Sequence, residues 1–408
     1  MRIWPALLVA MVALAAPASA ARWIGPDWIR GDSHAGVPTL AVNARGDALL
    51  AWGSSRGVRV AFAHDGGDFA RPRLITSPPS YPGPPAVALS DDGAAVVAWW
   101  ECHDYDSRLD ECLEATVRAA MRAPGRAFDA AGKLSGSLVL SQSPSVAVRG
   151  NRVVVAWQSE EGLATRRGRP GHGFGRTVTR YGGATTPYVG IGPPGVDSFV
   201  FQRRDAVTTG SRQRRGRFGP ARTAVRDAAE LRSVGFAPDG ERAVLWSSPA
   251  FHGTHLHATI LSPDGHKRSQ MVRRRVGTPR YTDTATLATA PDGHSLVTYT
   301  RGSDVFARMR RPGRPFGREQ RVPGAFPYES GAVNDHGRAL VLSPNGCTMN
   351  AATGSARGGF DATAGFRTVE VGGRCAGGGT PQVGLDARGR GYAAWGTGAD
   401  TWYARFRP

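Results

Sequence analysis

A short module that leads from a glycine to an aromatic residue recurs along the whole chain, and it constrains the fold more than any other sequence feature. The clearest copy is Pro85–Trp99, PAVALSDDGAAVVAW, which predicts a strand, a tight turn at Asp91-Asp92-Gly93 and a second strand. In each copy a glycine lies six residues before a large residue or its equivalent, except for one copy that is a residue longer. The copies are Gly46/Trp52, Gly93/Trp99, Gly150/Trp157 (the longer one), Gly195/Phe201, Gly240/Trp246, Gly293/Tyr299, Gly337/Ser343 and Gly389/Trp395. Trp52 and Trp395 are 343 residues apart in seven steps, a mean of 49, and periods of about 20–50 residues indicate solenoids, propellers or arrays.

Each repeat also has a second half. After the aromatic residue come a variable loop, a third apolar run such as Val58–Ala63, and a glycine-rich turn. A fourth run then opens on an aromatic residue in six repeats, at Phe69, Phe128, Phe174, Phe218, Phe316 and Phe366. Four short antiparallel strands at a spacing of about 45 residues are typical of a propeller blade. The sequence therefore predicts an all-β protein, a β-propeller.

The repeats divide the chain into eight predicted four-stranded blades. Their ranges are 38–77, 85–137, 144–180, 187–225, 232–273, 284–323, 328–371 and 380–408. Seven blades are the alternative, if the weak repeat around Ser343, which lacks the second-strand aromatic residue, is an insertion. The last repeat ends at Thr401–Phe406 after three strands, whereas Ala21–Arg30 resembles a fourth strand. We therefore expect residues 22–30 to complete the last blade and close the ring, which leaves no long unpaired strand edge.

Residues 1–20 predict a secretory signal peptide, which leaves residues 21–408 as a single propeller domain. Arg2 supplies the positive start, Ile3–Ala16 the apolar core and Ala18-Ser19-Ala20 a small-residue cleavage site. An uncleaved membrane anchor is the alternative, but the apolar run is short for a membrane span. We expect a secreted or extracytoplasmic monomer with no membrane span once the signal peptide is removed.

The chain is strongly basic, with a formal net charge of +18 and 51 Lys and Arg residues, of which only Lys133 and Lys267 are lysine. A basic surface attracts polyanions. No RNA- or DNA-binding motif accompanies the charge, so nucleic acid is not the expected partner.

Four cysteines, an even number in a chain expected to be exported, favour two disulfides, and they allow three pairings. In a four-stranded meander the 1–2 and 3–4 turns lie at one end, while the 2–3 turns and the connections between blades lie at the other. Pairing Cys102 with Cys112 and Cys347 with Cys375 keeps all four cysteines on one rim, so we prefer that pairing. A zinc site would need a tighter cluster, and no metal or cofactor is expected.

The longest insertion between second and third strands is Glu101–Glu114, ECHDYDSRLDECLE, and it is one candidate binding site. Inside the proposed disulfide it carries His103, Asp104, Tyr105, Asp106, Asp110 and Glu111. A rigid acidic loop over the mouth of the ring would suit a cation, a sugar or a basic peptide, since loops on rigid scaffolds often carry function. The alternative is a solvated loop that is stapled because it has no core of its own.

Arginine-rich turns between strands 3 and 4 form a second candidate site, at the opposite end of the ring. The candidate residues are Arg212, Arg214, Arg215, Arg217, Arg310 and Arg311. Gathered on one face, they would form a positive surface for an anionic polymer or an acidic glycan. The alternative is a solvated hairpin rim in an arginine-rich chain.

Three Pro-Asp-Gly turns, in Ala237–Gly240, Ser262–Gly265 and Ala290–Gly293, resemble those of secreted bacterial β-propellers of the TolB-like and sialidase-like kinds. The resemblance implies the propeller fold. The sialidase Asp-box pairs Ser-x-Asp-x-Gly with an aromatic residue, between the third and fourth strands. Ser90–Gly93 instead has its glycine one position early and lies between the first and second strands. This departure argues against sialidase chemistry.

The sequence contains no nucleophile elbow, zincin helix or phosphate loop. We therefore expect an exported, non-catalytic propeller that binds a glycan, a polyanion or a protein through its loop faces. The alternative is a glycan-active enzyme, sialidase-like or lyase-like, with arginines and carboxylates converging at the mouth of the central channel.

Overall fold

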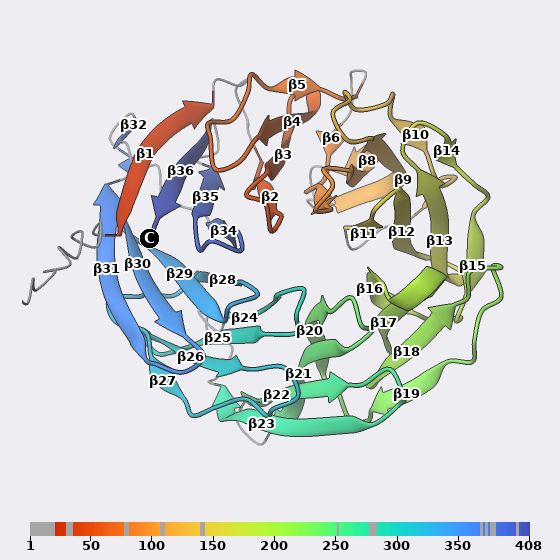
Figure 1. The fold of residues 1–408 in the computed structure, drawn as a ribbon. Helices are drawn as coiled ribbons and strands as arrows, with labels where there is room; N and C mark the ends of the chain where they lie inside the picture. The colour runs from red at the N-terminus through yellow and green to blue at the C-terminus, as the bar shows by residue number, and fades with distance from the viewer. Residues whose placement is uncertain are drawn as a thin grey trace, which may run out of the picture.

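The computed structural model describes residues 21–29, 36–76, 81–106, 111–138, 143–250, 253–276, 284–367, 370–371, 374–375, 381–396 and 400–408. In this part of the chain, eight antiparallel sheets are arranged around a central channel as the blades of a propeller (Figure 1). Each blade holds four strands in meander order, with the first strand innermost. The described residues also hold one short 3-10 turn, Pro193–Gly195. The predictions of an all-β propeller and of eight blades are confirmed.

The first two strands of each blade form the inner half of the ring. From blade 1 to blade 8, the first strands are β2 (Thr39–Val42), β7 (Ala86–Leu89), β11 (Ser145–Arg149), β16 (Thr185–Ile191), β20 (Glu230–Phe236), β24 (Ala285–Thr289), β28 (Ser330–Val333) and β34 (Gln382–Leu385). The second strands are β3 (Ala48–Ser54), β8 (Ala95–Asp106), β12 (Arg152–Ser159), β17 (Asp197–Arg203), β21 (Arg242–Ala250), β25 (Ser295–Arg301), β29 (Arg338–Asn345) and β35 (Gly391–Gly396).

The third and fourth strands complete the blades in the same order. The third strands are β4 (Gly57–Ala63), β9 (Glu111–Arg122), β13 (Gly162–Arg169), β18 (Ala206–Arg212), β22 (Gly253–Leu261), β26 (Asp304–Arg310), β30 (Thr348–Ser355) and β36 (Thr401–Arg407). The fourth strands are β5 (Arg73–Leu74), β10 (Gly132–Lys133), β14 (Gly173–Phe174) with β15 (Val178–Arg180), β19 (Arg222–Val225), β23 (Lys267–Val276), β27 (Gln320–Arg321), β31 (Phe360–Arg367) and β1 (Arg22–Ile29). Outside this pattern, β6 (Tyr81–Pro82) pairs with β8, and β32 (Glu370–Val371) pairs with β33 (Arg374–Cys375).

The N-terminal strand closes the ring, as the sequence predicted. β1 pairs antiparallel with β36, with Ile29 opposite Thr401 at one end of the ladder. The ring of Trp23 packs 5.2 Å from that of Phe406. In Figure 1 the red β1 lies beside the blue β36, so blade 8 contains strands from both ends of the described chain.

The hydrophobic core lies between neighbouring blades. Successive residues of a second strand point to opposite neighbours, so that in β3 Leu49 packs with blade 2 and Leu50 packs with blade 8. Because both faces of the strand are covered, both alternating positions are apolar, which explains the unbroken apolar runs in the repeat. The aromatic residues at the ends of these runs are fully buried at Trp52, Trp99, Trp157 and Trp395. Burial of one large apolar side chain contributes about 3 kcal/mol, so these residues are a main source of stability for the ring.

Blade 7 corrects one detail of the prediction and removes the seven-blade alternative. Its fourth strand, β31, begins at Phe360, and Phe366 lies near the end of that strand. The Phe360 ring lies over Gly354, where an added Cβ would be 2.7 Å from the ring, just as the Phe174 ring lies over Gly168 in blade 3. The repeat with the weak second strand is therefore a complete blade.

The predicted signal peptide, residues 1–20, lies outside the described residues and stays a prediction. Within the described part of the chain, no helix has the length and apolar character needed to cross a membrane.

Candidate binding sites

The antiparallel meander gives the ring two faces. The 1–2 and 3–4 turns lie at one face, which we call the turn face, and the 2–3 turns and blade connections lie at the other, which we call the loop face. The 1–2 turns need a residue with positive φ, as at Gly93 (φ 88°) and Gly240 (φ 95°). The glycine of the repeat is thus explained by turn geometry and indicates no ligand.

The first strands enclose a central cavity of about 840 Å³. Polar and apolar surface line it in about equal shares, with apolar side chains such as Leu40 and Leu287 along the first strands and charged groups at the turn-face end, where Asp91, Arg149 and Asp335 lie. The channel therefore combines apolar side chains along its length with charged groups at one mouth.

The charged groups at this mouth are tied into the blades. Nη1 of Arg149 donates to the carbonyl oxygens of Gly192, 3.0 Å away, and Pro238, 2.9 Å away, and so links blades 3, 4 and 5. Burial raises the pKa of Asp335, and a hydrogen bond from the backbone N–H of Asp292 opposes that rise. Arg149 is the single arginine among the described residues that line the cavity. The convergence of several arginines with carboxylates that a glycan-active site would need is not found in this part of the ring.

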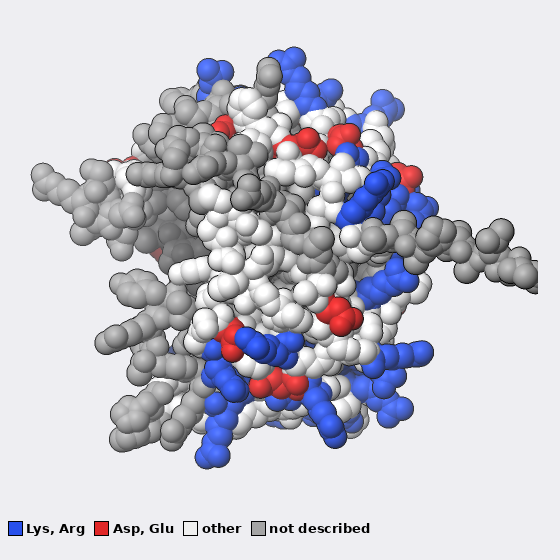
Figure 2. Space-filling view, turned by 90° about the vertical axis from the view of Figure 1, so that its left-hand side faces the viewer, with Lys and Arg blue, Asp and Glu red and all other residues white. Residues whose placement is uncertain are grey.

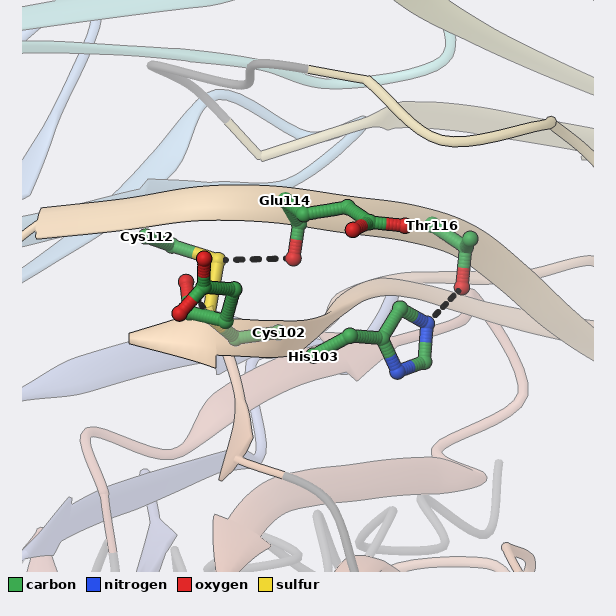
Figure 3. Close-up of a disulfide and its surroundings, with 6 residues drawn as sticks. Cys102, His103, Cys112, Glu114 and Thr116 are labelled. Carbon is green, nitrogen blue, oxygen red and sulfur yellow. Dashed lines mark hydrogen bonds between the residues drawn. A yellow bond between two sulfur atoms is a disulfide. The ribbon is translucent and has the colours of Figure 1, made fainter. Parts of the chain in front are cut away.

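A hairpin that extends blade 2 carries the first predicted site (Figure 3). β8 and β9 each have 12 residues, and a disulfide joins Cys102 to Cys112, whose Cα atoms are 5.8 Å apart. This is the pairing that the sequence favoured. Cys347 is disulfide-bonded as well. Its pairing with Cys375 stays a prediction, because the side chain of Cys375 lies outside the described residues.

The polar side chains of this hairpin do not converge where they are described. His103 points along the hairpin and its Nε2 lies 2.9 Å from Oγ1 of Thr116 on the neighbouring strand (Figure 3). Asp104 and Tyr105 are exposed. Three further candidate side chains lie outside the described ones, those of Asp106, Asp110 and Glu111. Over the described chain, no three His, Cys, Asp or Glu residues are grouped so that they could hold a metal ion, and the binding role of the hairpin stays a prediction.

Two of the six candidate arginines are buried groups that hold the ring together. Arg310 forms an ion pair with Glu241 across the interface of blades 5 and 6, and its Nε donates to the carbonyl oxygen of Arg314 at 2.8 Å. Arg212 is buried 5.2 Å from the ring centroid of Phe218. Each of the two arginines lies opposite the aromatic residue that follows its 3–4 turn. Their surroundings are those of packing residues.

A buried carboxylate joins two further arginines between blades 3 and 4. Asp197 forms ion pairs with Arg152 and with Arg167, whose Nε lies 2.6 Å from Oδ2. Burial raises the pKa of Asp197, and the two guanidinium groups oppose that rise. Both arginines are engaged with Asp197 inside the protein, although the three groups together keep one positive charge in excess.

The remaining candidate arginines stay on the surface of the turn face. The exposed candidates are Arg214, Arg215, Arg217 and Arg311. Arg314, on the same turn as Arg311, is exposed as well. None of these five guanidinium groups forms an ion pair with a residue that the structure describes. Figure 2, a view from the side of the ring, shows Lys and Arg side chains protruding from the described surface with acidic groups between them.

A cleft that the sequence did not predict opens on the turn face between blades 4 and 5. Its volume is about 610 Å³, and its lining residues include Arg222, Arg242 and Lys267. The sequence did carry a signal for it, because Arg242 is a basic residue four positions before Trp246, inside the apolar part of the repeat.

Comparisons with known proteins establish the class of fold and no narrower family. No protein-family model and no curated protein matches the chain. Among solved structures, the chain is similar to a prolyl endopeptidase structure, with a TM-score of 0.51 and 12% identity over 85% of this chain and 51% of that one. It is also similar to an ulvan lyase of family PL25, with a TM-score of 0.45 and 10% identity over 93% of this chain and 95% of that one. NanB sialidase of Streptococcus pneumoniae matches with a TM-score of 0.40 and 10% identity over 93% of this chain and 70% of that one. At these identities the likeness shows a propeller fold alone, since one fold hosts many functions.

Proposed function

We propose that this chain is an exported, non-catalytic β-propeller that binds an anionic polysaccharide through its turn face. The observation that carries the proposal is a set of exposed arginines on the 3–4 turns of blades 4 and 6, without carboxylate partners among the described residues. The set consists of Arg214, Arg215, Arg217, Arg311 and Arg314.

These arginines are the ones that the fold does not use. Other arginines of the same face already have carboxylate partners, as Arg310 has in Glu241 and Arg167 has in Asp197. An exposed guanidinium presents five N–H donors in a planar fork that matches sulfate and carboxylate groups. Several such charges close together attract a polymer with repeated negative charges more strongly than they attract a single ion.

The channel supports the non-catalytic part of the proposal. Arg149 is the single arginine among the described residues that line it, and its guanidinium is engaged with carbonyl oxygens of two neighbouring blades. Export is supported by the signal-like residues 1–20 and by the disulfide between Cys102 and Cys112, because disulfides persist in oxidising compartments.

Salt-dependent retention on immobilised heparin, used as a sulfated polysaccharide probe, tests polymer binding. The triple variant Arg214→Gln, Arg215→Gln, Arg217→Gln should elute at lower salt than the wild type. Its slope of log affinity against log salt should fall by about 2, since each phosphate-like contact contributes roughly 0.7–0.9. The matched control removes three exposed arginines from the loop face of the same blade, at Arg203, Arg204 and Arg226.

The two triple variants carry the same net charge. Comparing them therefore distinguishes binding at the turn face from non-specific attraction by the positive charge of the whole protein. Retention lowered equally in both would overturn the proposal, and so would a wild type that heparin does not retain. A wild type that binds duplex DNA and ignores heparin would also overturn it, because the partner would then be a nucleic acid.

Export is tested separately by expressing the full chain in a bacterial host and determining the N-terminus of the extracytoplasmic fraction by mass spectrometry. We expect the chain to begin at Ala21. A full-length chain that stays in the cytoplasm would contradict export. The heparin experiment would still test polymer binding independently.

A further inference from the structure

The cleft between blades 4 and 5 gathers three cationic residues. Blade 5 contributes Arg242 from β21 and Lys267 from β23, and blade 4 contributes Arg222 from β19. Hydroxyl-bearing residues of blade 4 also line the cleft, at Ser198, Thr209, Ser211 and Thr223. None of the described residues that line it is Asp or Glu. The cleft is therefore rich in hydrogen-bond donors and carries positive charge only.

Arg242 sets this cleft apart from the other blade interfaces. It lies four residues before Trp246, and the corresponding residues of the other seven repeats are Ala48, Ala95, Val153, Asp197, Ser295, Ala339 and Gly391. Small or apolar residues predominate there, and the single carboxylate, Asp197, is neutralised by Arg152 and Arg167. Arg242 is thus the only cation at this position of the repeat.

The charge of Arg242 is buried without compensation from the described chain. Its Nε is buried and has no hydrogen-bond partner among the described residues. Burial lowers the pKa of its guanidinium, and no acidic group opposes that shift. Elsewhere on this face buried or half-buried arginines meet carboxylates, as Arg310 meets Glu241 and Arg390 meets Asp386. An unpaired charge in such a place is unfavourable, and an anion from solution would relieve it.

We propose that this cleft binds a tetrahedral oxyanion, a phosphate or a sulfate group, either free or as an ester of a sugar-sized molecule. Such an ester presents three terminal oxygens that share its negative charge, which matches three cationic side chains with hydroxyl groups beside them. The Nζ of Lys267 donates to the carbonyl oxygen of Ala224, 3.2 Å away on the same strand as Arg222, so the cation of blade 5 is held at the wall of blade 4. A volume of about 610 Å³ lies in the range of small-molecule sites and exceeds what one ion fills.

This site is distinct from the exposed arginine surface proposed to bind a polymer. The exposed arginines are on 3–4 turns and reach bulk solvent, whereas Arg242 is partly buried between two blades. Either site can exist without the other, and the variants that test them do not overlap.

Isothermal titration calorimetry with inorganic phosphate and inorganic sulfate, at constant ionic strength set with sodium chloride, tests the proposal. The wild type should show saturable binding of one anion per chain. Arg242→Gln should weaken that binding by about tenfold or more, as expected for loss of a charge-assisted hydrogen bond. Lys267→Gln, which changes an exposed side chain, should weaken it in the same direction. Arg126→Gln, an exposed arginine on the turn face of blade 2, is the matched control and should bind as the wild type does.

Two further arms separate the sources of the oxyanion. Glucose 6-phosphate or glucose 6-sulfate binding more tightly than the inorganic ion would assign the cleft to an ester, and equal affinity would assign it to the free ion. The proposal is overturned if the wild type shows no saturable binding of any of these probes, or if Arg242→Gln binds as tightly as the wild type. Circular dichroism of each variant checks that the fold is kept. Heparin retention is measured on other variants, so a failure of oxyanion binding is distinguishable from a failure of polymer binding.

Discussion

Arg310 and Glu241 form a two-pronged ion pair across the interface between blades 5 and 6. Nη1 lies 2.7 Å from Oε1 and Nη2 lies 2.8 Å from Oε2. The side chain of Arg310 is 2% exposed and that of Glu241 is 16% exposed. Glu241 follows the 1–2 turn of blade 5, and Arg310 ends the third strand of blade 6. The carboxylate of one blade thereby compensates the charge of the guanidinium in the next, so the pair links the two blades.

Breaking this pair from one side should destabilise the ring. We expect Glu241→Gln to lower the free energy of unfolding by about 3 kcal/mol, because the buried guanidinium of Arg310 is left without a counter-charge. The double variant Glu241→Leu, Arg310→Met should recover much of that loss. Equilibrium urea unfolding at pH 7 measures both, with Glu161→Gln, an exposed residue in a 2–3 turn, as control. A single variant as stable as the control would show that the pair contributes little.

Removing the N-terminal strand should open the ring. In a chain of residues 30–408, β36, which carries Trp402 and Phe406, loses its partner strand and becomes a sheet edge. Exposed strand edges associate with one another. Compared with a chain of residues 21–408, we expect increased light scattering and a lower unfolding temperature. A synthetic peptide of residues 21–30 should restore the monomer by adding the missing strand, and a scrambled peptide should not. A truncated chain that stays monomeric with unchanged unfolding would contradict closure by β1.

The buried carboxylate of Glu329 should make stability depend on pH. Its Oε2 accepts a hydrogen bond from Oγ1 of Thr284 at 2.7 Å, and its Oε1 is buried without a partner in the described structure. Burial raises the pKa of Glu329 above its ordinary value of 4.5, although hydrogen bonds such as that of Thr284 oppose the rise. The ionised form therefore destabilises the fold. This loss of stability is absent below about pH 4.5, where the carboxyl of Glu329 is protonated in both the folded and the unfolded protein. It is complete above the pKa of Glu329 in the folded protein.

Glu329→Gln should accordingly raise the unfolding temperature at pH 8 and change it little at pH 4. Differential scanning calorimetry at the two pH values measures the difference, with Glu160→Gln as the exposed control. A variant that is less stable than the wild type at pH 8 would show that the carboxylate is better satisfied than its hydrogen bonds indicate.

The disulfide between Cys102 and Cys112 should protect the hairpin from proteolysis, and its removal should change the stability of the ring only slightly. It closes a loop with a sequence separation of 10 and lies at the end of β8 and β9, where both strands extend past the length of a blade. Disulfides of this span contribute roughly 2–3 kcal/mol by restricting the unfolded chain. In Cys102→Ser, Cys112→Ser, limited proteolysis should cut within residues 103–111 much faster, while the unfolding temperature of the ring changes by only a few degrees. Proteolysis spread over the whole chain would show that the hairpin supports the ring itself.

Replacing the uncompensated charge between blades 4 and 5 should stabilise the protein when no oxyanion is present. In chloride buffer we expect Arg242→Met to raise the free energy of unfolding by about 1 kcal/mol, because the apolar side chain removes a buried charge and keeps the packing. Arg126→Met is the exposed control and should change stability by less than about 0.5 kcal/mol. A less stable Arg242→Met in chloride buffer would indicate that the guanidinium has a partner within the protein.

The repeat made the architecture predictable, because the turns and the buried strands of each blade each require a recognisable local sequence pattern. The glycine of each 1–2 turn is required by a positive φ, and the apolar runs are required by burial on both strand faces, as at Leu49 and Leu50. Closure was predictable for the same reason, since residues 22–30 match a fourth strand. The error at Phe366 arose because Phe360, six residues earlier, satisfies the same local pattern.

The roles of the arginines were not predictable from the sequence, because they depend on the neighbouring blade. Arg212 and Arg214 are two residues apart on one turn, yet the first is buried and the second is exposed. Arg167 reaches Asp197 across 30 residues of sequence. Such pairings depend on how two blades meet, and the sequence of a single repeat does not encode that contact. On the sequence alone, the buried and the exposed arginines of the 3–4 turns therefore form one candidate surface.

The strand that seals blade 8 has a consequence for how the protein is made. Trp28 donates from Nε1 to Oδ1 of Asp400 at 3.0 Å, across 372 positions of sequence. The early segment that contains Trp28 must therefore wait for the much later segment that contains Asp400, and contacts between residues so distant in sequence form slowly. Until β36 has been made, the seven earlier blades form an open arc, and blade 8 is completed only when β1 pairs with β36.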